Sequence, residues 1–330
     1  MKSKNCLYIV WYPFQRRAES LAAAFNLDIK YFNFDWEQRG RSLKVISYFL
    51  KFCLTILTLI KSKPKYVFVQ LPPAFLLYTV AAYSIISRSR YVSDCHNSMI
   101  YADHWIKWPF AKFLLRRSFI TLTHNEDVRA IANDIHIPTV VLRDPLPNMS
   151  VPTDIEEVAE ISIRDTAYVI VPWGMAPDEP VKELFKAAGA TPEVLYVMTW
   201  FKERLPVSLQ MDAPDNIVFT GFLPEMSFNA LYANARAALV LTTLEGTQPS
   251  GAAEAIALGI PLVVSDIRTT RRLYQKAAVF VTNEPDSIAS GILYALENNI
   301  ELSSKVAGLR KQLVEDASSQ VNEVKRLLLK

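Results

Sequence analysis

A run of small residues beside two carboxylates, near residue 250, has the composition of a binding site for a phosphate and a ribose. The stretch from Ala238 to Asp266 reads as a strand, a loop, a helix, a turn and a second strand, and it contains three of the nine glycines in the chain. Ser250 is placed to cap the helix, and Gly251 and the alanines after it leave backbone N–H groups accessible to an anion. We therefore expect a phosphate to bind at the start of this helix.

The two carboxylates flank that helix start. Glu254 lies about one turn into the helix, where it can accept hydrogen bonds from paired hydroxyls such as those of a ribose. Glu245 is at the carboxyl end of the preceding strand, where open α/β sheets bind their ligands. The alternative is a solvated loop acid at 245 and a helix-dipole acid at 254. The acids, the glycines and the Pro-Ser-Gly turn occur together in register, which favours the ligand site.

This segment resembles the E-x7-E donor-site motif of retaining glycosyltransferases of the GT-B fold, family 4 type, including their ending Glu-Ala-x-Ala-x-Gly-x-Pro. The ranges 216–222 and 231–238 are similar to the preceding strand and helix of those enzymes. The resemblance implies the fold class α/β, GT-B, with two Rossmann-like domains facing across a cleft. It places a nucleotide sugar in the C-terminal domain and an acceptor in the N-terminal one.

The resemblance also implies roles for individual residues. Glu254 would bind the nucleotide ribose, Glu245 would face the hexose, and the N–H groups of Ser250 and Gly251 would hold the diphosphate. The loop residues Gly246 and Thr247 complete this predicted donor site.

The sequence departs from the family pattern in three places. Eight residues rather than seven separate Glu245 from Glu254, and Trp11 to Arg17 replaces the usual Gly-Gly loop. The usual donor-binding Arg and Lys are not evident at 172–180, and we assign Lys202 and Arg204 in their place. The ranges 93–97 and 173–179 weakly resemble the inverting β-1,4-mannosyltransferase of the dolichol pathway, which leaves the stereochemical outcome open.

An imidazole and a carboxylate close a short predicted strand in the N-terminal half. His96 and Asp94 lie in Ser-Asp-Cys-His-Asn, at the carboxyl end of that strand. A base there could serve an acceptor hydroxyl, with a pKa tuned by Asp94. The alternative is a structural histidine. The other histidines have no metal-ligand spacing, so zinc is not expected.

Aromatic and cationic residues alternate from 105 to 117. Aromatic rings at headgroup depth, with lysines reaching phosphates, are typical of a peripheral membrane face. The alternative is an ordinary surface helix with a tryptophan-anchored core. We assign an acceptor or membrane face to Arg16, Arg17, Trp105, Lys107, Trp108, Lys112, Arg116 and Arg117.

The longest apolar region runs from Ser42 to Ser62. Its polar residues recur every three or four positions and form one narrow helical stripe, with Lys51 in the middle of the region. The uncharged stretch is therefore shorter than the ~20 residues that a membrane span needs. We expect a mostly buried helix of an α/β domain, with a helix that dips into a membrane surface as the alternative.

Composition bounds the remaining possibilities. A net charge of +3 in 330 residues excludes a broad nucleic-acid-binding face. Three scattered cysteines argue against disulfides and structural zinc, and no G-x-G-x-x-G or P-loop pattern occurs. No Asp-x-Asp occurs either, so we expect no metal and no cofactor beyond the nucleotide diphosphate sugar as co-substrate. The N-terminal apolar run is too short for a signal peptide, which favours a cytoplasmic protein.

Alternation of apolar runs and helices predicts two domains. We expect an acceptor-binding Rossmann-like domain at 1–150, a nucleotide-sugar-binding one at 151–310, and a C-terminal helix at 311–330 that returns to the first. Predicted strands are 6–11, 66–70, 91–93, 119–123, 139–142, 167–171, 194–199, 217–220, 237–241, 262–265 and 279–281.

The sequence thus predicts a hexosyltransferase at the inner face of the plasma membrane. Its expected partners are a nucleotide-sugar donor, a glycan or polyprenyl-diphosphate-linked acceptor in cell-surface polysaccharide biosynthesis, and an anionic membrane surface. A nucleotide-sugar epimerase on the same scaffold and a non-catalytic glycosyltransferase-like subunit are the alternatives.

Overall fold

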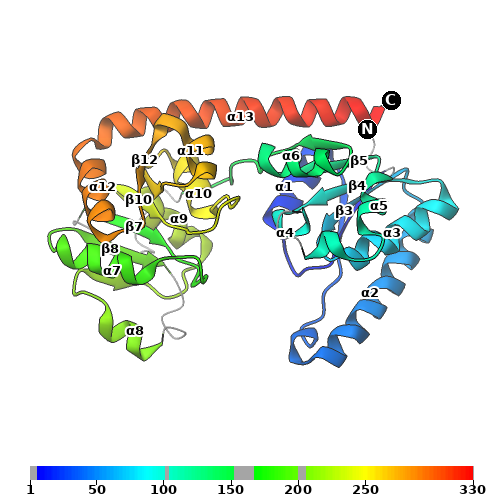
Figure 1. The fold of residues 1–330 in the computed structure, drawn as a ribbon, viewed down its shortest axis with the longest axis horizontal. Coiled ribbons are helices and arrows are strands. Elements are labelled where there is room, and N and C mark those ends of the chain that lie inside the picture. The colour runs from blue at the N-terminus through cyan, green and yellow to red at the C-terminus, as the bar shows by residue number, and fades with distance from the viewer. Residues whose placement is uncertain (1–5, 101–103, 152–166, 200–205, 330) are drawn as a thin grey trace. The chain divides into compact units, whose positions relative to one another are not determined.

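The structure is a computed structural model that describes residues 6–100, 104–151, 167–199 and 206–329. The chain forms two compact units. The first comprises Met1–Pro145 together with Glu315–Lys330, and the second comprises Leu146–Val314. Each unit is an α/β fold built on one six-stranded sheet (Figure 1).

The first unit has a wholly parallel sheet with the order β2-β1-β3-β4-β5-β6. Its strands read as apolar runs because helices cover both faces: Leu7 and Ile9 pack into one core and Tyr8 and Val10 into the other. The strands are β1 (Cys6–Val10), β2 (Asp28–Tyr31), β3 (Tyr66–Leu71), β4 (Arg90–Cys95), β5 (Ile120–Thr123) and β6 (Thr139–Val141). The helices are α1 (Arg16–Phe25), η2 (Glu37–Arg39), α2 (Arg41–Ser62), α3 (Ala74–Ser87), α4 (Asn97–Ile100), η3 (Trp105–Lys107), α5 (Ala111–Arg116) and α6 (Glu126–Asp134).

The second unit also has a wholly parallel sheet, with the order β12-β11-β10-β7-β8-β9. Counted along the chain, these strands have the order 3-2-1-4-5-6 of doubly wound sheets, and the strand order reverses between β7 and β10. Its strands are β7 (Tyr168–Pro172), β8 (Leu195–Thr199), β9 (Ile217–Phe219), β10 (Ala237–Val240), β11 (Leu262–Ser265) and β12 (Ala278–Val281). Its helices are α7 (Val181–Ala190), α8 (Val207–Asp212), α9 (Glu225–Ala233), α10 (Ser250–Leu258), α11 (Arg268–Tyr274), η6 (Gln275–Ala277) and α12 (Pro285–Glu297).

One 31-residue helix, α13 (Asn299–Leu329), contributes to both units. Val306 and Leu309 are buried in a core of the second unit. Val324 and Leu328 are buried beside Tyr8 in a core of the first unit. The last turns of the chain therefore complete the core of the unit that the first strand begins.

The predicted α/β class is confirmed, and every predicted strand is present within two residues of its expected bounds. The prediction missed β2, a four-residue edge strand of Asp, Ile, Lys and Tyr whose side chains alternate between exposed and half-buried. Its charged residues match an edge strand, and such short polar alternation carries little signal.

The expectation of a mostly buried helix at 42–62 is wrong. The polar side of α2 faces the unit, and its apolar side faces outward. Its polar stripe faces inward: Ser47, Lys51 and Thr55 are fully buried. Lys51 Nζ lies 2.6 Å from Glu37 Oε2, and Trp11 Nε1 donates to Thr55 Oγ1 at 3.0 Å. Most of the apolar side chains of α2 are exposed instead. By length and composition α2 could cross a membrane, a test that core helices also pass.

Candidate functional site

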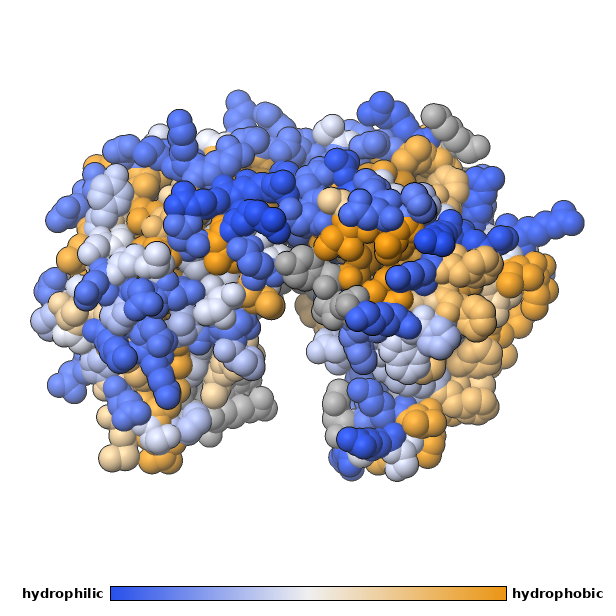
Figure 2. Space-filling view, in the orientation of Figure 1, coloured by the Kyte–Doolittle hydropathy of each residue, from blue (hydrophilic) through white to orange (hydrophobic). Residues whose placement is uncertain are grey.

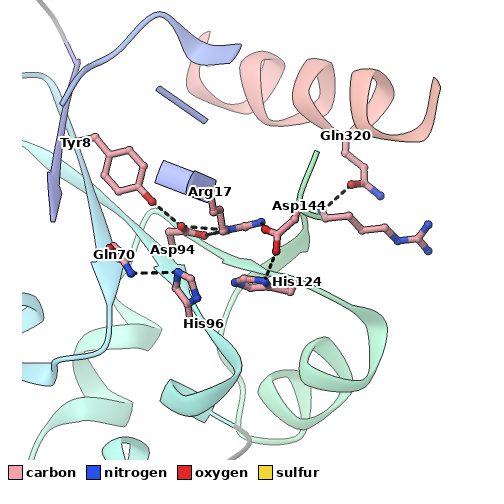
Figure 3. Close-up of polar contacts among 9 residues, drawn as sticks. Tyr8, Arg17, Gln70, Asp94, His96, His124, Asp144 and Gln320 are labelled. Carbon is pink, nitrogen blue, oxygen red and sulfur yellow. Dashed lines mark hydrogen bonds and ion pairs between the residues drawn. The ribbon is translucent and has the colours of Figure 1, made fainter. Parts of the chain in front are cut away.

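Polar side chains gather at the carboxyl ends of the strands in the first unit (Figure 3). Parallel strands end at one edge of a sheet, where open α/β folds bind ligands. The cluster consists of Arg17 in α1, Gln70 in β3, Asp94 in β4, His96 after β4, His124 after β5 and Asp144 after β6.

Arg17 is the centre of this cluster and is buried. Its Nε and Nη2 donate to Asp94 Oδ1 at 3.0 and 2.8 Å, and its Nη1 donates to Asp144. Tyr8 Oη donates to Asp94 Oδ2 at 2.5 Å. Burial opposes ionisation of Asp94, but the charge and hydrogen bonds of Arg17 outweigh it and lower the pKa of that carboxyl. Asp94 is therefore an ionised partner of Arg17.

The two histidines lie next to each other, with ring centroids 4.7 Å apart. Gln70 Nε2 is 3.2 Å from His96 Nε2, a distance at which the amide donates to an unprotonated ring nitrogen. Burial, followed by the neighbouring His124, lowers the pKa of His96 to about 4. His96 is consequently neutral at pH 7.

His124 is held by a carboxylate on its other side. Its Nδ1 lies 3.3 Å from Asp144 Oδ2. Burial opposes ionisation of Asp144, but His124 and Arg17 lower its pKa far below the ordinary value. Within the described part of the chain, the buried His124 Nε2 and Gln70 Oε1 have no hydrogen-bond partner. Two buried polar atoms beside His96 thus lack the partner that buried polar groups ordinarily have.

Two predicted roles change in this geometry. Arg17 is buried between two carboxylates, so it cannot be part of a membrane face, whereas its place at the acceptor site stays a prediction. Asp94 is hydrogen-bonded to Tyr8 and Arg17, and His96 is hydrogen-bonded to Gln70. Asp94 acts on His96 only through its charge, which opposes the larger effect of burial on the pKa of that imidazole.

In the second unit, Glu245, Gly246 and Thr247 lie in the loop between β10 and α10, and the other described donor residues lie in α10 itself. This loop is at the point where the strand order reverses. Glu245 Oε1 accepts from the backbone N–H of Arg268 at 3.1 Å, and Oε2 accepts from Thr269 Oγ1 at 3.2 Å. Gly246 has a φ of 79° and donates its N–H to Thr269 Oγ1 at 2.9 Å. Thr247, half-buried, follows in the same loop. These contacts fix the loop that leads to α10.

The start of α10 lies close to β7. A Cβ on Gly251 would lie 2.4 Å from Pro172 Cγ, so only glycine fits there. Pro249 is the N-cap and Ser250 is the first helical residue, without a side-chain capping bond, so the expected Ser250 cap is wrong. The first N–H groups of any α-helix lack intrahelical partners, and here they lie at the carboxyl edge of the sheet.

Glu254 is buried one turn into α10. Tyr232 in α9 donates to the carbonyl of Gly251 at 2.6 Å. Burial, and next the charge of Glu254, raise the pKa of Tyr232 well above its ordinary value. Helix α9 thus supports the turn of α10 that carries both Gly251 and Glu254.

The loop after β7 is attached to the segment that follows β10. Asp178 accepts a hydrogen bond from Thr242 Oγ1 at 2.5 Å, and its carbonyl accepts from Thr243 N at 2.8 Å. Glu179 accepts from the backbone N–H groups of Gly174 and Ala176 at 3.0 and 2.8 Å. The loops after β7 and β10, where the strand order reverses, therefore stabilise each other.

The predicted membrane segment is split between core and surface. Trp105 and Trp108 stack with centroids 5.5 Å apart and pack against the core of the first unit. The cations Lys107, Lys112, Arg116 and Arg117 are exposed. Lys202, Arg204 and the side chain of Arg16 lie outside the described residues. Among the residues that are described, no group of three or more His, Cys, Asp or Glu could hold a metal ion.

Sequence reasoning did not assign a role to Tyr8, Gln70, His124 or Asp144. The positions of three of these residues, at the ends of predicted strands, could have indicated a role. Gln70 ends a predicted strand, and His124 and Asp144 each follow one by no more than two residues. Because parallel strands share one carboxyl edge, polar residues at those three positions are expected to meet.

Comparison with protein families gives one match. Residues 201–319 match the family described as glycosyl transferases group 1, and this range includes Glu245 and Glu254. A search of curated proteins gave no match.

Solved structures share the fold along nearly the whole chain. HepE of Anabaena, solved in complex with UDP and glucose, has a TM-score of 0.71 at 13% identity and covers 98% of this chain and 99% of its own. Sucrose-phosphate synthase of Thermosynechococcus elongatus has a TM-score of 0.73 at 10% identity, with coverage of 98% and 99%. UDP-GlcNAc 2-epimerase of Methanocaldococcus jannaschii has a TM-score of 0.62 at 11% identity, with coverage of 90% and 93%.

Proposed function

We propose that this glycosyltransferase of the GT-B fold transfers a hexose from a nucleotide diphosphate sugar to a lipid-linked glycan in the assembly of a cell-surface polysaccharide. The observation that carries the proposal is the position of Glu245 and Glu254. Both lie in the range matched by the group 1 family, Glu245 in the loop after β10 and Glu254 in α10, where the reversal of the strand order between β7 and β10 offers a ligand site. HepE binds UDP and glucose on the same fold, which supports a nucleotide-sugar donor.

The donor is bound by α10 and the loop before it. Glu254 binds the ribose hydroxyls, and the N–H groups of Ser250 and Gly251 bind the diphosphate. The helix dipole and these donors stabilise the negative charge that develops on the leaving diphosphate. Glu245, whose carboxylate is oriented by Thr269 and the N–H of Arg268, faces the hexose. Lys202 and Arg204 supply the cation.

The acceptor is bound by the first unit. His96 is neutral at pH 7, because burial and His124 hold its pKa at about 4. Its Nε2 accepts from Gln70, so Nδ1 carries the hydrogen and can donate to a sugar hydroxyl. Gln70 Oε1 and His124 Nε2 are buried without a partner among the described residues, and they bind further hydroxyls once a side-chain movement exposes them. His96 thus orients an acceptor, and it takes the hydroxyl proton only if Gln70 releases Nε2.

We place the enzyme in the cytoplasm, peripheral to the inner face of the plasma membrane. Its exposed cations at 107, 112, 116 and 117 suit an anionic surface. A lipid-linked acceptor would be presented at that surface.

The competing function is a nucleotide-sugar epimerase, which the likeness to the 2-epimerase fold and the adjacent pair His96 and His124 support. Incubation with donor alone separates the two. An epimerase converts the sugar without an acceptor, which NMR of the donor detects. A non-catalytic subunit would show neither isomerisation nor transfer.

The deciding experiment screens nucleotide sugars for thermal stabilisation, since a ligand that binds the folded state raises the unfolding temperature. The sugar found is then titrated by calorimetry into the parent and into Glu254→Ala. Charged hydrogen bonds to ribose contribute ~1.5–3 kcal/mol each, so donor affinity should fall at least about tenfold. Glu297→Ala, an exposed glutamate in α12, is the matched control and should bind as the parent does. Equal donor affinity in Glu254→Ala would show that the ribose assignment is wrong.

A further inference from the structure

The outward surface of α2 is apolar from Val45 to Ile60, between polar residues in its first and last turns. Its exposed apolar side chains are Val45, Ile46, Phe49, Leu50, Phe52, Leu54, Leu57 and Ile60, which we name the α2 face. Helix α3, which packs against both α2 and α5, adds exposed Ile85 and Ile86. Figure 2 shows hydrophobic residues gathered along the right-hand edge of this unit, over α2 and α3. Exposed apolar surface of this extent marks a site of interaction.

The inward contacts of α2 hold this face outward. Lys51 is buried and pairs with Glu37, and Ser47 donates to the same carboxylate. Trp11 is bonded to Thr55. Withdrawing α2 from the unit would leave Lys51 and Glu37 without their partners, which is strongly unfavourable for a buried pair. The helix therefore stays on the unit and presents only its outer face.

The charge of the surrounding chain is strongly one-sided. Residues 38–125 contain thirteen Lys or Arg and only two acids, Asp94 and Asp103, although the whole chain has a net charge of +3. Asp94 is buried against Arg17. This stretch includes α2, α3 and α5. A second copy of the same face would bring like charges together, whereas an anionic lipid surface complements it.

A basic pocket lies at the edge of the α2 face. It has a volume of about 520 Å³ and is lined by Ile60, Lys63, Lys65, Arg88 and the hydroxyl-bearing Ser87 and Ser89, among others. None of the ion pairs found among the described residues involves these three cations. The pocket has an apolar side chain next to cations and hydroxyl groups. A lipid needs both, because its phosphate binds cations and hydroxyls while its acyl chain packs against apolar side chains.

We propose that α2 lies in the plane of an anionic phospholipid bilayer, with the α2 face inserted among the acyl chains and Lys63, Lys65 and Arg88 bound to lipid phosphates. An apolar face flanked by cations is the pattern of interfacial helices. Between α3 and α5, a groove of about 470 Å³ lined by Ile85, Phe110 and Phe113 receives part of an acyl chain. The inference rests on the proposed function for its location, and it adds a second membrane contact besides residues 105–117.

The test is flotation of the full chain with vesicles of equal parts phosphatidylcholine and phosphatidylglycerol, without nucleotide sugar. Phe49→Gln/Leu57→Gln removes two side chains that are 65% and 63% exposed. Vesicle affinity should fall at least about tenfold, since each loses much of its apolar transfer free energy. Val207→Gln/Met211→Gln, on residues of α8 that are 72% and 81% exposed, is the matched control and should float as the parent does.

A second variant tests the basic pocket. Lys63→Ala/Lys65→Ala/Arg88→Ala should weaken binding about 100-fold, at ~1 kcal/mol per cation near an anionic surface. The control Lys276→Ala/Arg310→Ala/Lys311→Ala removes three exposed cations from the second unit. Thermal unfolding of each variant verifies that it folds.

Failure of the parent to float, or equal flotation of parent and Phe49/Leu57 variant, would overturn the proposal. If the parent self-associates but does not float, and only the Phe49/Leu57 variant abolishes the self-association, the α2 face would be assigned to a second copy of the chain. Donor binding and transfer are measured separately, so a failure here would contradict the proposed membrane location and leave the proposed glycosyl transfer standing.

Discussion

Adding one methyl group to Gly251 should displace the start of α10 and weaken donor binding. The new Cβ would lie 2.4 Å from Pro172 Cγ, 3.2 Å from Pro172 Cβ and 3.3 Å from Val240 Cγ2. Since Cβ contacts under 3.0 Å essentially never occur, α10 or the proline ring must move by at least 0.6 Å, the difference between 3.0 and 2.4 Å. A misplacement of about 1 Å at a site can reduce activity about 100-fold.

Stability and binding should separate in three Gly→Ala variants. A Cβ on Gly291 would lie 2.2 Å from Val281 Cγ1, which is not in the loop before α10. A Cβ on Gly308 would have no heavy atom of the described residues within 4 Å, apart from the backbone of its own helix. Overpacking destabilises by ~1–3 kcal/mol, partly offset by ~1 kcal/mol of helix propensity. In urea, the free energy of unfolding of the 251 and 291 variants should therefore equal that of the parent or be lower by up to about 2 kcal/mol. That of the 308 variant should equal the parent's or be slightly higher.

Calorimetry with the donor found in the thermal screen completes this comparison. Only Gly251→Ala should lose donor affinity, because only there does the displaced backbone carry the N–H groups that bind the diphosphate. Parent-like affinity in Gly251→Ala, or an equal loss in Gly291→Ala, would refute the placement of the diphosphate at this helix.

Two further outcomes are expected. Because the folded pKa of His96 is lowered to about 4 from an ordinary value near 6.5, the unfolded chain binds more protons between these values, and the free energy of unfolding should decrease as the pH falls from about 6.5 to 4. Urea titrations should show this decrease reduced in His96→Gln, and an unchanged slope would contradict the neutral, half-buried imidazole. Transfer rates in excess EDTA should equal those with added magnesium or manganese, because the helix N–H groups and a side-chain cation meet the diphosphate charge; loss of activity in EDTA that metal restores would contradict that mechanism.

The strands and the donor segment were predictable because their signals are local. Apolar runs bounded by turns mark parallel strands, and the acids and glycines around Gly251 occur in one continuous segment. The close approach of Gly251 to Pro172 was not predictable, because the two residues are 79 positions apart in the chain and meet only when β7 and β10 pair.

The orientation of α2 and the burial of Arg17 were not predictable by the usual rules. A polar stripe on an apolar helix is ordinarily read as the solvent side, whereas Lys51 is buried here because Glu37 neutralises it. Arg17 reads as a surface cation beside Arg16, yet Asp94 and Asp144 compensate its burial from 77 and 127 positions away. Both errors concern charges whose partners are not apparent from the sequence pattern.

The path of α13 has a consequence for the order in which the protein folds during synthesis. The first unit ends its main run at Pro145, but Val324 and Leu328 fill its core only after the second unit has been made. At 5–20 residues per second, the ribosome needs roughly 10–35 s for the intervening residues. Throughout that time the surface beside Tyr8 and Phe25 that α13 later covers is open. The first unit to be translated is thus the last to be completed, and a nascent chain that stalls after residue 145 carries an unfinished core.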